Sequence, residues 1–212
     1  ALPRPPPFCY SRRMPTWNVE QYLRFAAERT RPSHDLASAI ALEAPRRIVD
    51  LGCGPGNSTS VLAERWPGAD ISGMDSSQEM VDAARRGLPG RTFEVGDIAQ
   101  WEPTTPYDLV FSNAALQWVE DHERLVPRLV SAVAKGGAWA AQVPCNMLAP
   151  AHEAMRRAAE RPEFQAYFKE GVQRWHVHGA EFYFDVIAPL ALRVDILKRH
   201  LCVLPPGSSH SL

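Results

Sequence analysis

The sequence predicts an α/β fold built on a doubly wound, mostly parallel β-sheet. Short apolar runs alternate with helical stretches between residues 46 and 144, an alternation typical of parallel strands joined by crossover helices. A glycine-rich loop follows the first apolar run. Ligands of such sheets bind at the carboxyl ends of the strands, near the first strand–helix turn. We therefore expect a ligand site in the loop from Asp50 to Gly56.

The strands and helices of this core follow one another in chain order. The N-terminal part predicts a helix over 17–32 that ends at Pro32, because proline disrupts a helix interior, and a second helix over 34–45. The expected strands cover 46–52, 69–75, 91–98, 107–113 and 138–144. The expected intervening helices cover 57–66, 76–87 and 122–137.

Three local signals place the helix ends. Asn57 or Ser58 is the expected cap of the helix over 57–66. The spacing of Ser76 and Glu79 predicts a capping box at the start of the next helix. Gly136 is expected to end the helix over 122–137.

Changes in composition divide the chain. Residues 1–13 are proline-rich and basic, which predicts a disordered tail, and residues 205–212 form a second tail. We expect one domain over 14–204. Its parts are a helical lid over 15–44, the ligand-binding core over 46–144, a helical cap over 150–190 and an edge strand over 192–204.

The bulk composition argues against several classes of partner. The 212 residues carry 23 Lys and Arg against 24 Asp and Glu, and without a basic stripe there is no electrostatic footprint for nucleic acid. The four cysteines form no CxxC pair, which is typical of reduced thiols rather than disulfides or a zinc site. No apolar run approaches the length of a membrane span. We expect a soluble, cytoplasmic monomer that binds neither nucleic acid nor membrane.

The glycine-rich loop does not match the phosphate-binding motifs. A Walker loop needs a lysine that is absent, and the dinucleotide fingerprint is G-x-G-x-x-G, whereas Gly52, Gly54 and Gly56 are spaced G-x-G-x-G. Asp50 at the strand end would repel a pyrophosphate and attract an ammonium group. The loop therefore suits a nucleoside with an amino-acid tail, approached closely by backbone without side chains. The alternative is a tight turn that only packs helix on strand.

Polar residues also end the next three expected strands. Asp75 lies 19 residues after Gly56, where a carboxylate accepts hydrogen bonds from ribose hydroxyls. Asp97 and Ile98 would place a carboxylate and an apolar wall beside a purine. Each aspartate alone is equally compatible with a helix cap or turn, and Asn113 either binds the ligand or forms an Asx turn. Carboxylates at three successive strand ends favour the ligand site.

These residues resemble a known family. The segments "VDLGCGPGNST", "GMDSS", "VGDI" and "DLVFSNAALQWV" resemble Rossmann-like class I methyltransferases that use S-adenosylmethionine. More narrowly, "WNVEQYLRFAAERTRP", "NAALQWVEDH" and "QVPCN" resemble the trans-aconitate 2-methyltransferase family. The resemblance implies that the glycines line the cofactor, Asp75 holds the ribose, Asp97 and Ile98 contact adenine, and Asn113 lies beside the methionine part. The expected cofactor-binding set is Asp50, Gly52, Gly54, Gly56, Asn57, Asp75, Ser76, Asp97, Ile98 and Asn113.

The resemblance also implies the reaction. Ser112 to Ala115 stand where enzymes that methylate amino groups have an Asn/Asp-Pro-Pro-aromatic motif, which counts against that reaction. The resemblance instead implies esterification of trans-aconitate or a similar small polycarboxylate. A carboxylate is already ionised at neutral pH, so no general base is required. The cations expected to hold the other carboxylates are Arg29 and Arg31, which would otherwise be a solvated helix end.

Other candidates are weaker. Trp17, Tyr22 and Trp118 could wall the substrate pocket, although buried aromatics are more often plain core. The cap adds further substrate candidates, namely Arg156, Arg157, Arg174, His176 and His178. The His176-x-His178 pair lacks a third ligand at convincing spacing, so we expect no metal.

The sequence departs from the resembling family at its end. Family members continue past the sixth strand to a seventh, antiparallel edge strand, and this chain ends near its sixth. A sheet that lacks the edge strand predicts reduced stability and weak turnover. Two alternatives stay open: a methyltransferase for another free acid or an acyl-carrier-bound dicarboxylate, and a truncated, inactive cofactor-binding pseudoenzyme.

Overall fold

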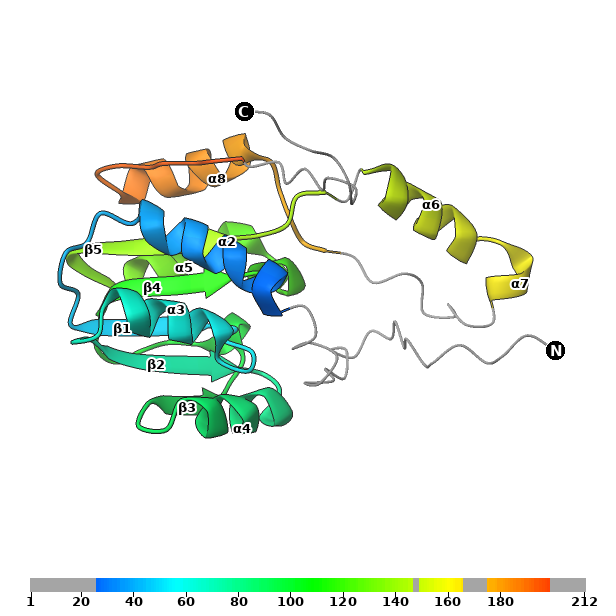
Figure 1. Ribbon diagram of the computed structural model, residues 1–212. Helices are drawn as coiled ribbons and strands as arrows, with labels where there is room; N and C mark the ends of the chain where they lie inside the picture. The colour runs from blue at the N-terminus through cyan, green and yellow to red at the C-terminus, as the bar shows by residue number, and fades with distance from the viewer. Residues whose placement is uncertain (1–25, 147–148, 166–174, 199–212) are drawn as a thin grey trace, which may run out of the picture.

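The computed structural model describes residues 26–146, 149–165 and 175–198. These residues form a parallel sheet of five strands in the order β3-β2-β1-β4-β5. Its central strand β1 pairs with β2 on one side and β4 on the other, so the chain order reverses beside β1 (Figure 1). The expected doubly wound α/β sheet is confirmed, and the reversal places the predicted ligand site next to β1.

The strands coincide with the apolar runs of the sequence. Their bounds are β1 Arg47–Leu51, β2 Asp70–Asp75, β3 Thr92–Val95, β4 Tyr107–Asn113 and β5 Val133–Gln142. The central strands are buried on both faces, because helices cover both sides of a parallel sheet. In Figure 1 the arrows of β2 and β4 point to the right, so the carboxyl ends of these strands lie on that side.

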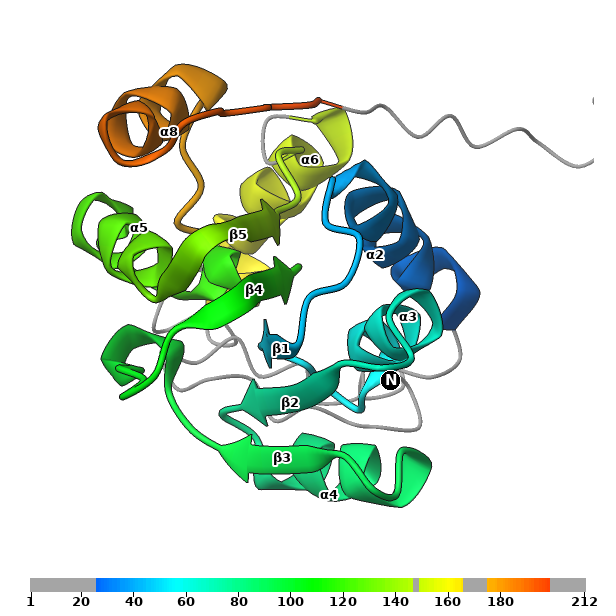
Figure 2. The same cartoon turned by 90° about the vertical axis from the view of Figure 1, so that its left-hand side faces the viewer.

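The helices form two layers around the sheet. Their bounds are α2 Ala26–Ala39, α3 Asn57–Arg65, α4 Gln78–Gly87, α5 His122–Ser131, α6 Pro150–Ala159, α7 Pro162–Gln165 and α8 Ala180–Ile187, with 3-10 turns η1 Ile98–Gln100, η2 Leu116–Trp118 and η3 Ala188–Leu190. Figure 2 shows α2 and α3 on one face of the sheet and α5 on the other. Figure 1 shows α6 and α7 reaching beyond the carboxyl ends of the strands.

Alternate residues of each strand supply the two halves of the core. On the α2 and α3 face, Ile48 and Phe111 pack with Leu62 and Trp66. On the α5 face, the core includes Val49, Leu51, Val110, Leu125 and Leu129. Successive residues of β1 and β4 point to opposite faces of the sheet, and both faces are buried. Both strands therefore appear in the sequence as continuous apolar runs.

The expected helix end at Pro32 is wrong. Helices are expected over 17–32 and 34–45 with a break at Pro32; within the described residues, which begin at 26, α2 instead runs from Ala26 to Ala39 with Pro32 inside it. A proline in a helix interior costs about 3 kcal/mol. Tertiary packing outweighs this cost, because α2 packs on α3 and β5 and buries Ser33 and Ala37.

The boundary between the last core helix and strand also differs from expectation. The helix predicted over 122–137 ends at Ser131, and β5 begins at Val133. Pairing with β4 is irregular between Val133 and Ala138, and within that stretch a Cβ on Gly137 would lie 2.5 Å from the carbonyl oxygen of Asp108. The glycines therefore serve a bulge that brings β5 close to β4, not a helix end.

Both predicted helix caps are misplaced by one residue. Gly56, in a left-handed conformation, precedes α3, and neither Asn57 nor Ser58 caps it. Ser77 rather than Ser76 caps α4, and its hydroxyl accepts from the backbone N–H of Met80. The reason is that Asp75 accepts from the backbone N–H of Ser77 and fixes the turn before the helix.

The edge strand predicted over 192–204 is not found where the structure describes this segment. Residues 192–198 have no regular structure, and Leu192, Ile196 and Leu197 are exposed rather than packed. Residues 199–204 lie outside the described part of the chain, as do the tails over 1–13 and 205–212 and the first part of the expected lid, 15–25.

Candidate functional site

The loop after β1 lies against the end of β2 and against Ala115, which follows β4. Its backbone N–H groups at Gly52 and Cys53 donate to the carbonyl oxygen of Met74, at 2.7 and 3.0 Å. Gly52, Gly54 and Gly56 all have positive φ, between 55° and 97°, which glycine adopts without strain. A Cβ on Gly52 would lie only 2.2 Å from the Cβ of Ala115. The glycines are therefore required by the path of the loop itself.

Asp50 is the penultimate residue of β1, just before this loop, and is fully buried. Its Oδ2 accepts hydrogen bonds from the hydroxyls of Ser58 and Thr59 on α3, at 2.6 and 2.7 Å. Burial nevertheless raises the pKa of Asp50 to about 6. Its Oδ1 is buried and has no hydrogen-bond partner among the described residues. One oxygen of Asp50 thus anchors α3, and the other has no partner among the described residues, which leaves the expected ligand contact a prediction.

Asp75 connects the glycine-rich loop to the start of α4. Its Oδ2 accepts from the backbone N–H of Gly54 and its Oδ1 from that of Ser77, both at 2.9 Å. Burial raises its pKa, and these backbone bonds oppose the rise. Each carboxylate oxygen has a second lone pair for a ligand hydroxyl. The neighbouring Ser76 is exposed.

The end of β3 leads into the turn η1. Asp97 is exposed, and its Oδ1 accepts from the backbone N–H of Ala99 at 2.8 Å, so it caps this turn. Ile98 is buried against the core on the α5 face, and its carbonyl oxygen accepts from Arg128 at 3.0 Å. Asp97 thus caps the turn, as its alternative reading allowed, while Ile98 packs in the core, and their contact with a purine stays a prediction.

Asn113 ends β4, and its Oδ1 is buried without a partner in the described part of the chain. Asn113 pairs in register with Gln142 at the end of β5, and the Oε1 of Gln142 is likewise buried and unpartnered among those residues. A buried acceptor without a donor costs about 1–3 kcal/mol. Two such oxygens on neighbouring strand ends indicate a place where a ligand supplies N–H or O–H groups. The rule that ligands bind at strand ends could have identified Gln142, which the sequence analysis missed.

An aromatic cluster follows Asn113. The ring of Trp118, in η2, meets Trp175 edge-on with centroids 5.8 Å apart. The ring of His152, in the first turn of α6, also meets the ring of Trp175 edge-on, with centroids 5.6 Å apart. Trp118 therefore joins an aromatic wall between the end of β4 and the cap, and Trp175 and His152 are the members that sequence reasoning missed because they come from distant segments.

The structure places only part of the expected lid. Asn57 donates from Nδ2 to the hydroxyl of Thr30 on α2 at 3.4 Å, which ties α2 to the glycine-rich loop. Arg31 is exposed on α2. Arg29 lies in α2, but its side chain is outside the described structure, as are Trp17, Tyr22 and Arg174.

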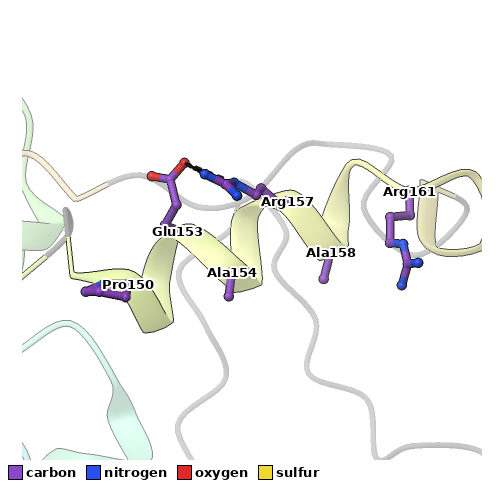
Figure 3. Close-up of a pocket in the computed structure, with 6 residues that line it drawn as sticks. All are labelled: Pro150, Glu153, Ala154, Arg157, Ala158 and Arg161. Carbon is purple, nitrogen blue, oxygen red and sulfur yellow. Dashed lines mark hydrogen bonds and ion pairs between the residues drawn. The ribbon is translucent and has the colours of Figure 1, made fainter.

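Arg157 and Arg161 line an open depression along α6 (Figure 3). Its lining residues are Pro150, Glu153, Ala154, Arg157, Ala158 and Arg161. Glu153 forms ion pairs with Arg156 and with Arg157, and Arg161 pairs with Glu163. These arginines are thus paired on the cap itself. His176 pairs with Glu120 at 3.6 Å.

Two further kinds of feature are absent from the described residues. Within 26–146, 149–165 and 175–198, no three His, Cys, Asp or Glu side chains are grouped so that they could hold a metal ion. In the same residues, no helix is long and apolar enough to cross a membrane.

This chain is similar in sequence to known methyltransferases. The model of a methyltransferase domain matches residues 48–137, the part that contains the glycine-rich loop and the strand ends. The trans-aconitate 2-methyltransferase of Yersinia pseudotuberculosis is 46% identical over 186 residues, which cover 87% of this chain and 72% of that protein.

Solved structures agree on the fold. A methyltransferase in complex with the Haloferax volcanii activator Trm112 superposes with a TM-score of 0.60 at 19% identity, over 81% of this chain and 72% of that one. The plantazolicin methyltransferase BpumL, solved with S-adenosylhomocysteine, gives a TM-score of 0.52 at 20% identity, over 79% and 65% of the two chains. On the identity and coverage of the Yersinia relative, this chain belongs to the trans-aconitate 2-methyltransferase family of S-adenosylmethionine-dependent methyltransferases.

Proposed function

We propose that this chain transfers a methyl group from S-adenosylmethionine to a carboxylate oxygen of trans-aconitate or a similar small polycarboxylate, which gives a monomethyl ester. The observation that carries the proposal is the 46% identity over 87% of the chain to a protein of that activity. The arrangement of the strand ends supports it, because donors and acceptors there suit an adenosyl amino acid.

The residues at the strand ends fit the cofactor part by part. Asp75 has acceptor capacity for the ribose hydroxyls, and the exposed carboxylate of Asp97 with buried Ile98 suits the adenine. The unpartnered oxygens of Asp50 and Asn113 would accept from the ammonium group of the methionine part. Gly52, Gly54, Gly56, Asn57 and Ser76 complete the proposed cofactor-binding set.

The protein's main task in this reaction is positioning. When bound, S-adenosylmethionine supplies an activated methyl group on a positively charged sulfur. The acceptor carboxylate is ionised at neutral pH, since its ordinary pKa is near 4, so no side chain has to remove a proton. The aromatic wall of Trp118, Trp175 and His152 would exclude water and orient the acid. Alignment of two reactants contributes about 7–11 kcal/mol to such a reaction.

Cationic side chains on α2 would hold the carboxylates that do not react. Arg31 is exposed and free of any ion pair shown for the described residues, whereas Arg156 and Arg157 already pair with Glu153. We therefore assign this role to Arg31, with Arg29 on the same helix. Trp17 and Tyr22 are assigned to the wall of the pocket from the sequence resemblance.

A methyl-transfer assay across a panel of acids tests the proposal. The panel contains trans-aconitate, other di- and tricarboxylates, a monocarboxylate and a thioester-linked dicarboxylate, and mass spectrometry detects the ester. We expect trans-aconitate or a close analogue to give the highest kcat/KM. Turnover only of the thioester would replace the free-acid proposal. Calorimetric binding of S-adenosylmethionine without ester formation from any acid would contradict catalysis.

A further inference from the structure

We infer that His122 and Tyr183 are positioning residues for the acceptor side of the site. They hold the turn η2, which carries Trp118, against the segment that leads from the cap into α8. The inference rests on the proposed function for its kinetic consequences. Its structural basis is independent of the substrate, because it consists of contacts between η2 and residues 175–183.

His122 lies between the two elements and is 1% exposed. Its Nε2 lies 2.9 Å from the carbonyl oxygen of Leu116, and its Nδ1 lies 2.8 Å from the hydroxyl of Tyr183. A carbonyl oxygen can only accept, so Nε2 carries the ring proton. In the neutral ring Nδ1 is then an acceptor, and Tyr183 donates to it. One imidazole therefore connects η2 to α8.

The other two residues of η2 are held by the same segment. The backbone N–H of His176 donates to the carbonyl oxygen of Gln117 at 2.9 Å. The ring of Trp175 meets that of Trp118 edge-on. Every residue of η2 thus contacts residues 175–183 directly or through His122, and η2 begins three residues after Asn113.

This arrangement separates the two halves of the site. The groups assigned to the cofactor lie at the ends of β1, β2, β3 and β4 or in the turns directly after them, and the sheet fixes these strands. Trp118 lies on η2, whose position against the cap depends on the bonds of His122 and Tyr183. Loss of these bonds should therefore loosen the aromatic wall and weaken acceptor binding, while the cofactor half is unaffected.

The variant Tyr183→Phe tests the inference with the loss of one hydroxyl. We expect the KM for the acceptor acid to rise roughly three- to tenfold, because the variant loses the bond to His122 and the longer 3.4 Å bond that the hydroxyl accepts from the backbone N–H of His178. The Kd for S-adenosylhomocysteine should stay within about twofold of wild type. Tyr107→Phe is the matched control, because Tyr107 packs on Trp101 at the opposite end of β4. Equal effects of the two variants on the acceptor KM would overturn the inference.

Variants of His122 separate its two bonds. A glutamine amide reaches the position of Nε2 and an asparagine amide that of Nδ1, so His122→Gln keeps the bond to Leu116 and His122→Asn the bond to Tyr183. Adding Tyr183→Phe to His122→Gln should change the acceptor KM less than about twofold further, because the bond to His122 is already lost and only the long 3.4 Å bond from the N–H of His178 remains to be removed. Additive effects would contradict a shared bond.

Amide hydrogen exchange gives a readout that needs no substrate. The N–H of His176 should exchange roughly three- to tenfold faster in Tyr183→Phe than in wild type or Tyr107→Phe. If wild type methylates no acid but this exchange difference is present, the proposed function fails and the positioning role stands. If the exchange rates are equal, the positioning role is wrong whatever the activity.

Discussion

Replacing Asp50 by asparagine should remove a pH-dependent destabilisation from the folded protein. Burial raises the pKa of Asp50 from its ordinary value of 3.8 to about 6. Between these pH values the folded state binds more protons than the unfolded state, so this group's contribution to stability is greatest below pH 4 and is lost as the pH rises through 6. Since one pKa unit corresponds to 1.36 kcal/mol, the charged form costs about 3 kcal/mol at pH 7.5.

The pH dependence of unfolding measures this cost. Urea unfolding, followed by tryptophan fluorescence, gives the unfolding free energy of wild type and Asp50→Asn from pH 4 to pH 7.5. The difference between the two proteins should shift by roughly 2–3 kcal/mol over this range in favour of Asp50→Asn. Titrating groups that do not interact with Asp50 cancel in the difference, whereas the charge of Asp75, which contributes to the raised pKa of Asp50, is part of the measured effect.

A matched control separates burial from charge. Asp70→Asn removes an exposed carboxylate at the start of β2, where solvent screens charge, so its difference from wild type should change much less with pH. A flat difference for Asp50→Asn would refute the reasoning, because it would mean that the buried carboxylate costs the fold nothing. Addition of S-adenosylmethionine should reduce the advantage of Asp50→Asn at pH 7.5, since the ligand ammonium favours the charged carboxylate.

Three further predictions concern the same loop and its surroundings. Gly52→Ala should lower stability by at least about 2 kcal/mol in thermal unfolding, because its Cβ would lie 2.2 Å from another Cβ, whereas Gly68→Ala, with open space around it, should not. Asp75→Ala should weaken S-adenosylmethionine binding by roughly 1.5–3 kcal/mol in calorimetry, and an unchanged Kd would remove Asp75 from the ribose site. Burial raises the pKa of the Cys53 thiol far above its ordinary range, so iodoacetamide should label exposed Cys145 and spare Cys53 until the protein unfolds, as mass spectrometry of the labelled peptides will show.

Local patterns were sufficient for the sheet and for the ligand loop. Alternating apolar runs gave the five strands in order, because strand and helix periods are properties of short segments. The spacing of Gly52, Gly54 and Gly56 and the carboxylates after the next strands also lie within single turns. They meet at one edge of the sheet because the strands are parallel, so that all their carboxyl ends lie on the same side.

Helix ends were harder to predict because distant contacts decide them. Pro32 indicates a helix end locally, yet packing of α2 on α3 and β5 carries the helix through it. Gly136 and Gly137 also resemble a helix end, and only the approach of β5 to β4 shows that they form part of a bulge. In both places, burial outweighs a local preference of a few kcal/mol.

The amino-acid sequence by itself predicted the fold class, the succession of strands along the chain and the glycine-rich loop that resembles the family's. Tertiary structure alone decided which side chains complete the site. Gln142 meets Asn113 through strand pairing, and Trp118 meets Trp175 across 57 residues of chain. The sequence places Asp50 near the end of a strand, and only the structure shows that the hydroxyls of Ser58 and Thr59 on α3 donate to one of its two oxygens. The physical reason is that residue spacing fixes contacts within a turn or strand, whereas contacts between segments depend on how the whole sheet and its helices pack.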